Sequence, residues 1–168
     1  MNHVIFTEYN NSTSTIKPYL EFLFMLTNKV EYITEITSFS SDATLAFLLA
    51  NKTLTAYSKL FDDDILTLLE YSKKQQYNVE YTVVDDLTNI NIPKTDLLFL
   101  NINSEYDETL RVLKRYQNAV GRYIVINNIR NIDTILAVTE FISDSTWTIK
   151  KQFVANEGLL LLSQTKSI

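Results

Sequence analysis

The sequence predicts an α/β protein with a doubly wound sheet of seven strands, mostly parallel, and helices on both faces. Strand-like apolar runs alternate with helical patterns along most of the chain, which is typical of successive βαβ units. The run 96–101 is apolar on both faces, as a central parallel strand should be. The 168 residues have the length of one domain, which we expect over 14–168 after a loose segment at 1–13.

The first strand and helix set the frame for the rest. Residues 30–36 alternate β-branched and aromatic side chains, and 43–50 form a compact apolar helix. Between them lies a short polar turn in which Ser41 or Asp42 is placed to cap the helix. In open parallel sheets, ligands bind at the carboxyl ends of the strands, so this turn belongs to the expected crevice.

The other elements follow in the same alternation. An amphipathic helix is expected over 14–28, with Pro18 tolerated in its first turn. Later elements are expected at 53–58 (strand), 65–76 (helix), 79–84 and 96–101 (strands), 105–119 (helix), 121–128 (strand), 131–143 (helix), and 147–154 with 159–163 (a closing hairpin). Gly158 suits a left-handed position in the hairpin turn, and Trp147 is expected to pack against the hairpin.

Composition excludes several classes of partner and chemistry. The net charge is −5 without any basic run, so a nucleic-acid partner is not expected. The absence of cysteine excludes disulfides and thiolate nucleophiles. The longest apolar run near the start, 22–26, is too short to span a membrane and no signal pattern precedes it, so we expect a cytoplasmic location without membrane contact. The single histidine, His3, is expected to be solvated.

Three segments resemble one family. The segment E-I-T-S-F-S-S-D (35–42) resembles E-x-G-x-x-x-G-x-S/T-T, the first motif of class I S-adenosylmethionine-dependent methyltransferases. The segments 96–101 and 121–128 resemble the V-D-L-L-F-I-D and G-G-Y-I-V-I-H-D patterns of the O-methyltransferase group that includes cephalosporin-hydroxylase-like and macrocin-methyltransferase-like proteins. The resemblance covers about 30–162. It implies a Rossmann-like sheet with an antiparallel last strand, and S-adenosylmethionine as the cofactor.

The chain departs from the family where ligands bind. Thr37 and Ser41 stand where the family has glycine, and Leu60 aligns with the acid that holds the cofactor ribose. The family's strand-end Asp and His-Asp are replaced by Asn101 and by Asn127 with Asn128. The acid at the Asn101 position helps bind a divalent cation in metal-assisted relatives, and an amide is a weaker ligand, so no metal site is expected.

We therefore predict a methyltransferase-fold protein with degenerate cofactor and metal sites and no catalytic residue, acting as a binding or structural module. A protein partner or self-association is expected through the first helix or the edge strands. The vestigial crevice positions are Glu35, Thr37, Ser38, Phe39, Ser41, Leu60, Asp62, Asp85, Asp86 and Asn101.

Two alternatives stay open. One is an active S-adenosylmethionine-dependent O-methyltransferase with an atypical pocket that uses Ser38, Ser41, Asp62 and Asp85 and needs no metal. The other is a small-molecule sensor. If the alignment is shifted by two residues, Asp62 takes the position of the family's ribose-binding acid, and Asp85 or Asp86 could face the adenine amine. The aspartates have simpler roles as well: Asp62 can cap the helix that follows, while Asp85 and Asp86 are acids in a loop after a strand.

Overall fold

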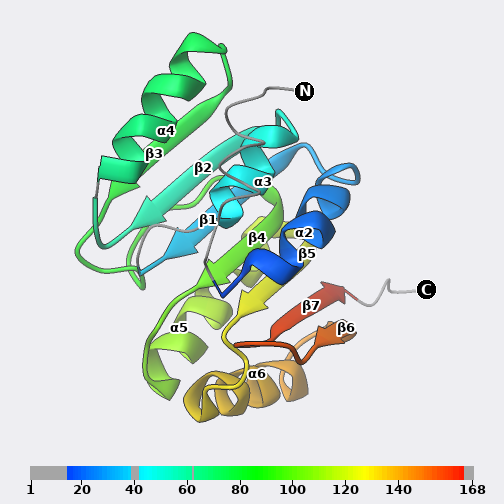
Figure 1. Ribbon diagram of the computed structural model, residues 1–168. Coiled ribbons are helices and arrows are strands. Elements are labelled where there is room, and N and C mark those ends of the chain that lie inside the picture. Colours follow the sequence, from blue (N-terminus) through cyan, green and yellow to red (C-terminus); the bar gives the residue numbers. More distant parts are fainter. Residues whose placement is uncertain (1–14, 39–41, 62, 165–168) are drawn as a thin grey trace.

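A computed structural model describes residues 15–38, 42–61 and 63–164, and these residues contain one sheet of seven strands (Figure 1). The strand order is β3-β2-β1-β4-β5-β7-β6. The bounds are β1 Tyr32–Thr37, β2 Thr53–Ser58, β3 Val79–Val83, β4 Thr95–Asn101, β5 Val120–Asn127, β6 Trp147–Phe153 and β7 Leu159–Gln164. The first five strands are parallel, and β7 runs antiparallel to both β5 and β6. The predicted Rossmann-like sheet is confirmed.

Helices cover both faces of the sheet, as predicted (Figure 1). Residues of α2 (Leu20–Thr27), α3 (Ala43–Leu49) and α4 (Asp63–Lys74) pack on one face. Residues of α5 (Tyr106–Tyr116) and α6 (Ile132–Ser143) pack on the other. Short 3-10 turns, η1 (Lys17–Tyr19) and η2 (Gln117–Ala119), adjoin α2 and α5. Within the described ranges, no helix combines the length and apolar composition needed to cross a membrane.

Alternating side chains of the strands build two separate cores. On the α3 face, the rings of Phe47 and Phe99 meet edge to face, with centroids 5.6 Å apart. On the α5 face, Leu100 belongs to the cluster that contains Phe141 and Trp147. Trp147 is 1% exposed, in agreement with its predicted packing role.

Some element boundaries differ from the prediction. The first helix was expected from residue 14, but α2 begins at Leu20 after η1, whose first turn holds Pro18. Proline has no N–H to donate and fixes φ, which suits a short tight turn ahead of a helix. Asp42 precedes α3 in helical geometry and makes no side-chain cap, so the predicted capping role of Asp42 is wrong. An effective cap residue usually has extended dihedrals.

The connection from β3 to β4, residues 84–94, crosses the sheet without forming a helix. Leu87 and Ile90 of this loop are buried in the α5-face core. The Tyr116 hydroxyl donates to the Leu87 carbonyl oxygen at 2.8 Å and accepts from the Ile90 amide at 3.1 Å. Burial raises the pKa of this hydroxyl. One tyrosine on α5 therefore fixes the loop that carries Asp85 and Asp86.

Amide side chains occupy most left-handed backbone positions of the described chain. Asn51, Gln76, Asn128 and Asn156 all have positive φ, and Gly158 has φ +78° in the hairpin turn, as predicted. Asparagine tolerates this conformation better than most residues.

Candidate functional site

The carboxyl edge of the sheet carries a row of uncharged polar residues. Thr37 ends β1 and pairs in register with Ser58, which ends β2, and with Asn101, which ends β4. The Asn127 Nδ2 at the end of β5 donates to the Asn101 Oδ1 at 3.0 Å. These four residues, which we call the neutral row, end four adjacent strands where the fold places its ligand crevice.

Thr37 closes the space that a glycine would leave in the neutral row. Thr37 is 1% exposed. The described residues with positive φ do not include Thr37. The backbone therefore does not need glycine here for its conformation. A glycine at this position would serve close approach of a ligand to the chain, which the threonine side chain restricts.

Ser38 is used to join two loops. Its amide donates to the Asn101 carbonyl oxygen at 3.1 Å, and its hydroxyl accepts from the Asn103 amide at 3.2 Å. The side chain is 7% exposed. The Ser38 amide and hydroxyl, which could otherwise bind a ligand, are therefore both used in hydrogen bonds to the end of β4 and the loop that follows it.

Asn127 is nearly enclosed, at 3% exposure. Its Nδ2 also lies 3.3 Å from the Glu157 Oε2, in the β6–β7 turn. Asn128 follows in the left-handed conformation and starts the turn that leads into α6. Sequence reasoning missed Glu157, because only the hairpin fold brings it beside the end of β5.

Glu35 lies inside the fold, two residues before the end of β1. It is fully buried, and its Oε2 accepts a hydrogen bond of 2.7 Å from the Thr44 hydroxyl on α3. The carboxyl group thus joins β1 to the helix that follows it.

The second strand ends at Ser58, which the sequence analysis did not single out. Leu60 lies two residues beyond it with its side chain 52% exposed. The Leu60 amide donates to the Ser58 Oγ at 3.2 Å, and its carbonyl oxygen accepts from the Tyr81 hydroxyl at 3.2 Å. Neither Ser58 nor Leu60 carries a charge, and Asp62, the acid that a shift of two residues would align with the family's acid, lies outside the described residues.

The two acids after β3 are exposed in the β3–β4 loop. Asp86 accepts hydrogen bonds from the Thr88 hydroxyl and amide at 2.7 and 2.8 Å, which lower the pKa of the Asp86 carboxyl. This is an Asx-type turn that organises the loop itself. Phe39, Ser41 and Asp62 lie outside the described residues.

An ion pair reaches across the end of β1. Lys59 leaves β2, and its Nζ lies 2.8 Å from the Glu108 Oε1 on α5, which follows β4. Because β1 lies between β2 and β4, this pair spans the carboxyl end of β1. Both side chains are partly exposed, at 35% and 22%.

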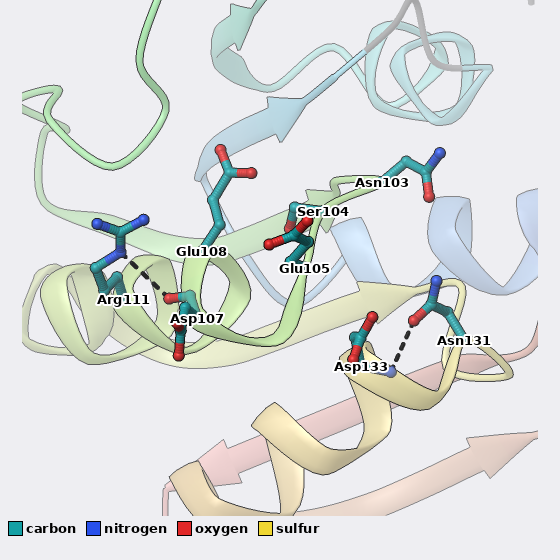
Figure 2. A pocket seen from close by; sticks show the side chains of 8 residues that line it. All are labelled: Asn103, Ser104, Glu105, Asp107, Glu108, Arg111, Asn131 and Asp133. Carbon is teal, nitrogen blue, oxygen red and sulfur yellow. Dashed lines mark hydrogen bonds between the residues drawn. The ribbon is translucent and has the colours of Figure 1, made fainter.

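An open hollow of about 550 Å³ lies between the starts of α5 and α6 (Figure 2). Its polar groups mostly serve their own helices: the Asn131 Oδ1 accepts from the Asp133 amide at 2.8 Å, and the Arg111 Nε donates to the Asp107 carbonyl oxygen at 3.3 Å. Its lining residues are Asn103, Ser104, Glu105, Asp107, Glu108, Arg111, Asn131 and Asp133. Four carboxylates and one guanidinium make it acidic.

The described residues offer little for metal binding. In 15–38, 42–61 and 63–164, no group of three or more His, Cys, Asp or Glu side chains is arranged to hold a metal ion. Carboxylates are the ligands that hard cations prefer, and the neutral row supplies amides and hydroxyls in their place.

Comparison with known proteins identifies the fold through structure and not through sequence. No protein-family model matches the chain, and no curated protein has significant sequence similarity to it. The SAH-bound methyltransferase PaMTH1 from Podospora anserina is 12% identical, with a TM-score of 0.65 over 99% of this chain and 89% of that one.

Two further solved structures agree. The SAH-bound magnesium protoporphyrin IX methyltransferase of Synechocystis is 6% identical, with a TM-score of 0.69 over 96% of this chain and 94% of that one. A putative caffeoyl-CoA O-methyltransferase from Staphylococcus aureus is 12% identical, with a TM-score of 0.64 over 97% and 98%. The chain therefore has the Rossmann-like fold of class I S-adenosylmethionine-dependent methyltransferases.

Proposed function

We propose that this chain is a methyltransferase-fold protein that does not catalyse methyl transfer and acts as a binding or structural module. The neutral row carries the proposal: the strands β1, β2, β4 and β5 each end in an uncharged residue, and the family's motifs have glycine at the Thr37 position and an acid at the Asn101 position. We also propose that the chain derives from the cephalosporin-hydroxylase-like and macrocin-methyltransferase-like O-methyltransferases and that its motifs have degenerated.

The expected loss of cofactor affinity is large. A hydrogen bond to a charged group contributes about 1.5–3 kcal/mol, and each 1.4 kcal/mol is about tenfold in affinity. Without an acid at Ser58 or Leu60, the ribose hydroxyls lose a charged acceptor. The Thr37 side chain adds a steric cost on the neighbouring strand. Together these changes are expected to move cofactor binding beyond useful concentrations.

Methyl transfer would also lack a base and a metal. Asn101 and Asn127 are amides that hydrogen-bond to each other at 3.0 Å. An amide does not take up a proton near neutral pH, and it is a weaker ligand than a carboxylate for a cation that would lower the pKa of a substrate hydroxyl.

The experiment is a thermal unfolding series with S-adenosylmethionine and with S-adenosylhomocysteine. A ligand at 100 times its Kd adds about 2.7 kcal/mol of stability, which corresponds to roughly 5–10 °C for a domain of this size. We expect no rise in Tm at millimolar concentration of either compound. A rise of that size would overturn the proposal and support the alternative of an active methyltransferase.

One observation favours that alternative. Structural neighbours of the chain were solved with bound SAH, and they align over almost the whole of it. If the Tm rises, transfer of a labelled methyl group to small hydroxylated acceptors would be the next measurement.

A further inference from the structure

A groove of about 540 Å³ lies on the α2 face of the sheet, between α2 and the strands β5, β6 and β7. Phe22, Met25 and Leu161 supply apolar surface, and Tyr123 lines it near the middle of β5. Lys29 precedes β1, and Lys150, Lys151 and Leu161 come from the middle of β6 and β7, so no residue of the neutral row lines the groove.

A β-bulge brings two lysines to this groove together. Adjacent residues on a regular strand point to opposite faces of the sheet. In β6, Ile149 pairs with Leu162 and Lys151 pairs with Leu161, so Lys150 is the extra residue of an irregular register. Both Lys150 and Lys151 line the groove as a result. Bulges commonly redirect a side chain in this way.

Among residues 15–38, 42–61 and 63–164, no carboxylate forms an ion pair with a lysine of the groove. Within the described residues, Lys52, Lys59 and Lys114 pair with carboxylates. No such pair involves Lys29, Lys150 or Lys151. The Lys151 Nζ lies 5.2 Å from the ring centroid of Phe22 and 4.5 Å from that of Phe153, which holds the charge over the apolar floor.

The charge of the groove is opposite to that of the whole chain. Three lysines against one acid, Glu21, give the lining a charge of +2, while the chain carries −5. Met25 is 60% exposed beside these cations. An unbranched thioether adapts to different apolar shapes and is frequent on surfaces that bind peptides.

We propose that this groove binds an acidic, amphipathic peptide segment of a protein partner. An apolar side chain of the segment would rest on Phe22, Met25 and Leu161, and its carboxylates would meet Lys29, Lys150 and Lys151. Charge complementarity supports this occupant, because the apolar floor and the unpaired lysines together fit a ligand that is both apolar and anionic.

Other modes of binding fit less well. β6 is an edge strand, but a bulge and two lysines disfavour addition of a further strand there. Nucleic-acid sites usually combine many phosphate contacts, and three lysines around an apolar floor are few for that purpose. A second copy of this chain has a net charge of −5, which suits the lysines, but no described segment of the chain stands out as the part that would enter the groove.

This inference names a partner class for the binding role proposed above, but it can be tested separately. The groove and the neutral row have no residue in common, so peptide binding in the groove can be measured independently of S-adenosylmethionine binding in the crevice. The cofactor titration can fail while peptide binding succeeds, and the reverse also holds.

The test is fluorescence anisotropy with the full chain and a labelled short peptide composed of glutamate and leucine. The double variant Lys150→Glu/Lys151→Glu is expected to weaken binding about tenfold. Met25→Asp is expected to weaken it as well, without unfolding the protein, because Met25 is largely exposed. Peptides with serine in place of leucine, or lysine in place of glutamate, are expected not to bind.

The matched control is Lys73→Glu/Lys74→Glu, which makes the same charge change at exposed positions near the end of α4. It is expected to bind like the parent chain. Equal binding by the groove variant and this control would overturn the proposal. Preferential binding of anionic vesicles or of an oligonucleotide, or a dimer on sizing that Lys150→Glu/Lys151→Glu dissociates, would assign the groove to another occupant and overturn it too.

Discussion

The interior of the sheet and its carboxyl edge differ in the kind of side chain that they hold. In β4, Leu97 to Leu100 are fully buried and pack on both helical layers, as a central parallel strand requires. One residue further, Asn101 belongs to the neutral row. The interior determines whether the chain folds, whereas the edge determines which ligand it binds, so the two can change independently.

A substitution in the interior of the sheet should lower the free energy of unfolding more than one at its carboxyl edge. Phe99→Ala is expected to lower the free energy of unfolding by about 3–5 kcal/mol, because it opens a cavity beside Phe47 in a fully buried layer. Asn101→Ala, two residues along the same strand, serves as the edge control and is expected to cost about 0.5–1.5 kcal/mol. Urea unfolding of both variants measures the difference, and equal losses would contradict it.

The next largest effect should come from restoring the edge. The variant Thr37→Gly/Ser41→Gly/Leu60→Asp is expected to gain a Tm rise with S-adenosylhomocysteine of roughly 5–10 °C at saturation. A second variant that carries Ser58→Asp in place of Leu60→Asp tests the residue that ends β2. The two variants differ only in the position of the aspartate, so the one with the larger Tm rise identifies the position that suits the cofactor ribose. If neither variant gains a Tm rise with the ligand, the neutral row does not account for the absence of binding.

Gly158 tests the hairpin that supports the end of β5, and Gly121 within β5 serves as its control. A Cβ at Gly158 would lie 2.7 Å from the Ile129 Cγ1, and its φ is +78°. Gly158→Ala is therefore expected to cost about 1–3 kcal/mol. At Gly121 the nearest atom would be 3.6 Å away, so Gly121→Ala should change stability by less than about 0.5 kcal/mol. Thermal unfolding of both proteins compares the two sites.

The smallest effect should come from exposed charges that join α5 to α6. Hydrogen bonds from Tyr106 and then from Lys114 lower the pKa of Glu140 below its ordinary value of 4.5. A lowered carboxyl pKa stabilises the folded state above the unfolded value, and this contribution is lost as the pH falls through the folded pKa. Tm is therefore expected to fall below about pH 4.5, and to fall less steeply in Glu140→Gln. Parallel curves for the two proteins would exclude this role.

Most of the fold could be predicted from local patterns. The strand at 53–58 was predicted with its observed bounds, and the alternation of apolar residues identified the other strands to within two residues. The carboxyl ends of parallel strands lie at one edge of a sheet, so Thr37 and Asn101 were correctly placed at the same edge. Helix starts were less predictable, because Pro18 and Asp42 act through dihedral angles that composition does not determine.

The contacts of the site were harder to predict. The Asn127 amide meets Glu157 across 30 positions of sequence, and Lys59 meets Glu108 across 49. Such pairs depend on how the elements pack, and no local pattern marks them. Ser58 was missed for a different reason: the strand was predicted to end there, but the family's acid was aligned with Leu60, two residues beyond that end.

The amides at positive φ have a consequence for recognising relatives of this chain. Asn51, Asn128 and Asn156 hold left-handed turn positions, a conformation that glycine adopts most readily. With two glycines in 168 residues, the chain offers little glycine spacing by which a relative could be recognised. Comparison of three-dimensional structures finds many counterparts for the chain, whereas no protein-family model matches its sequence.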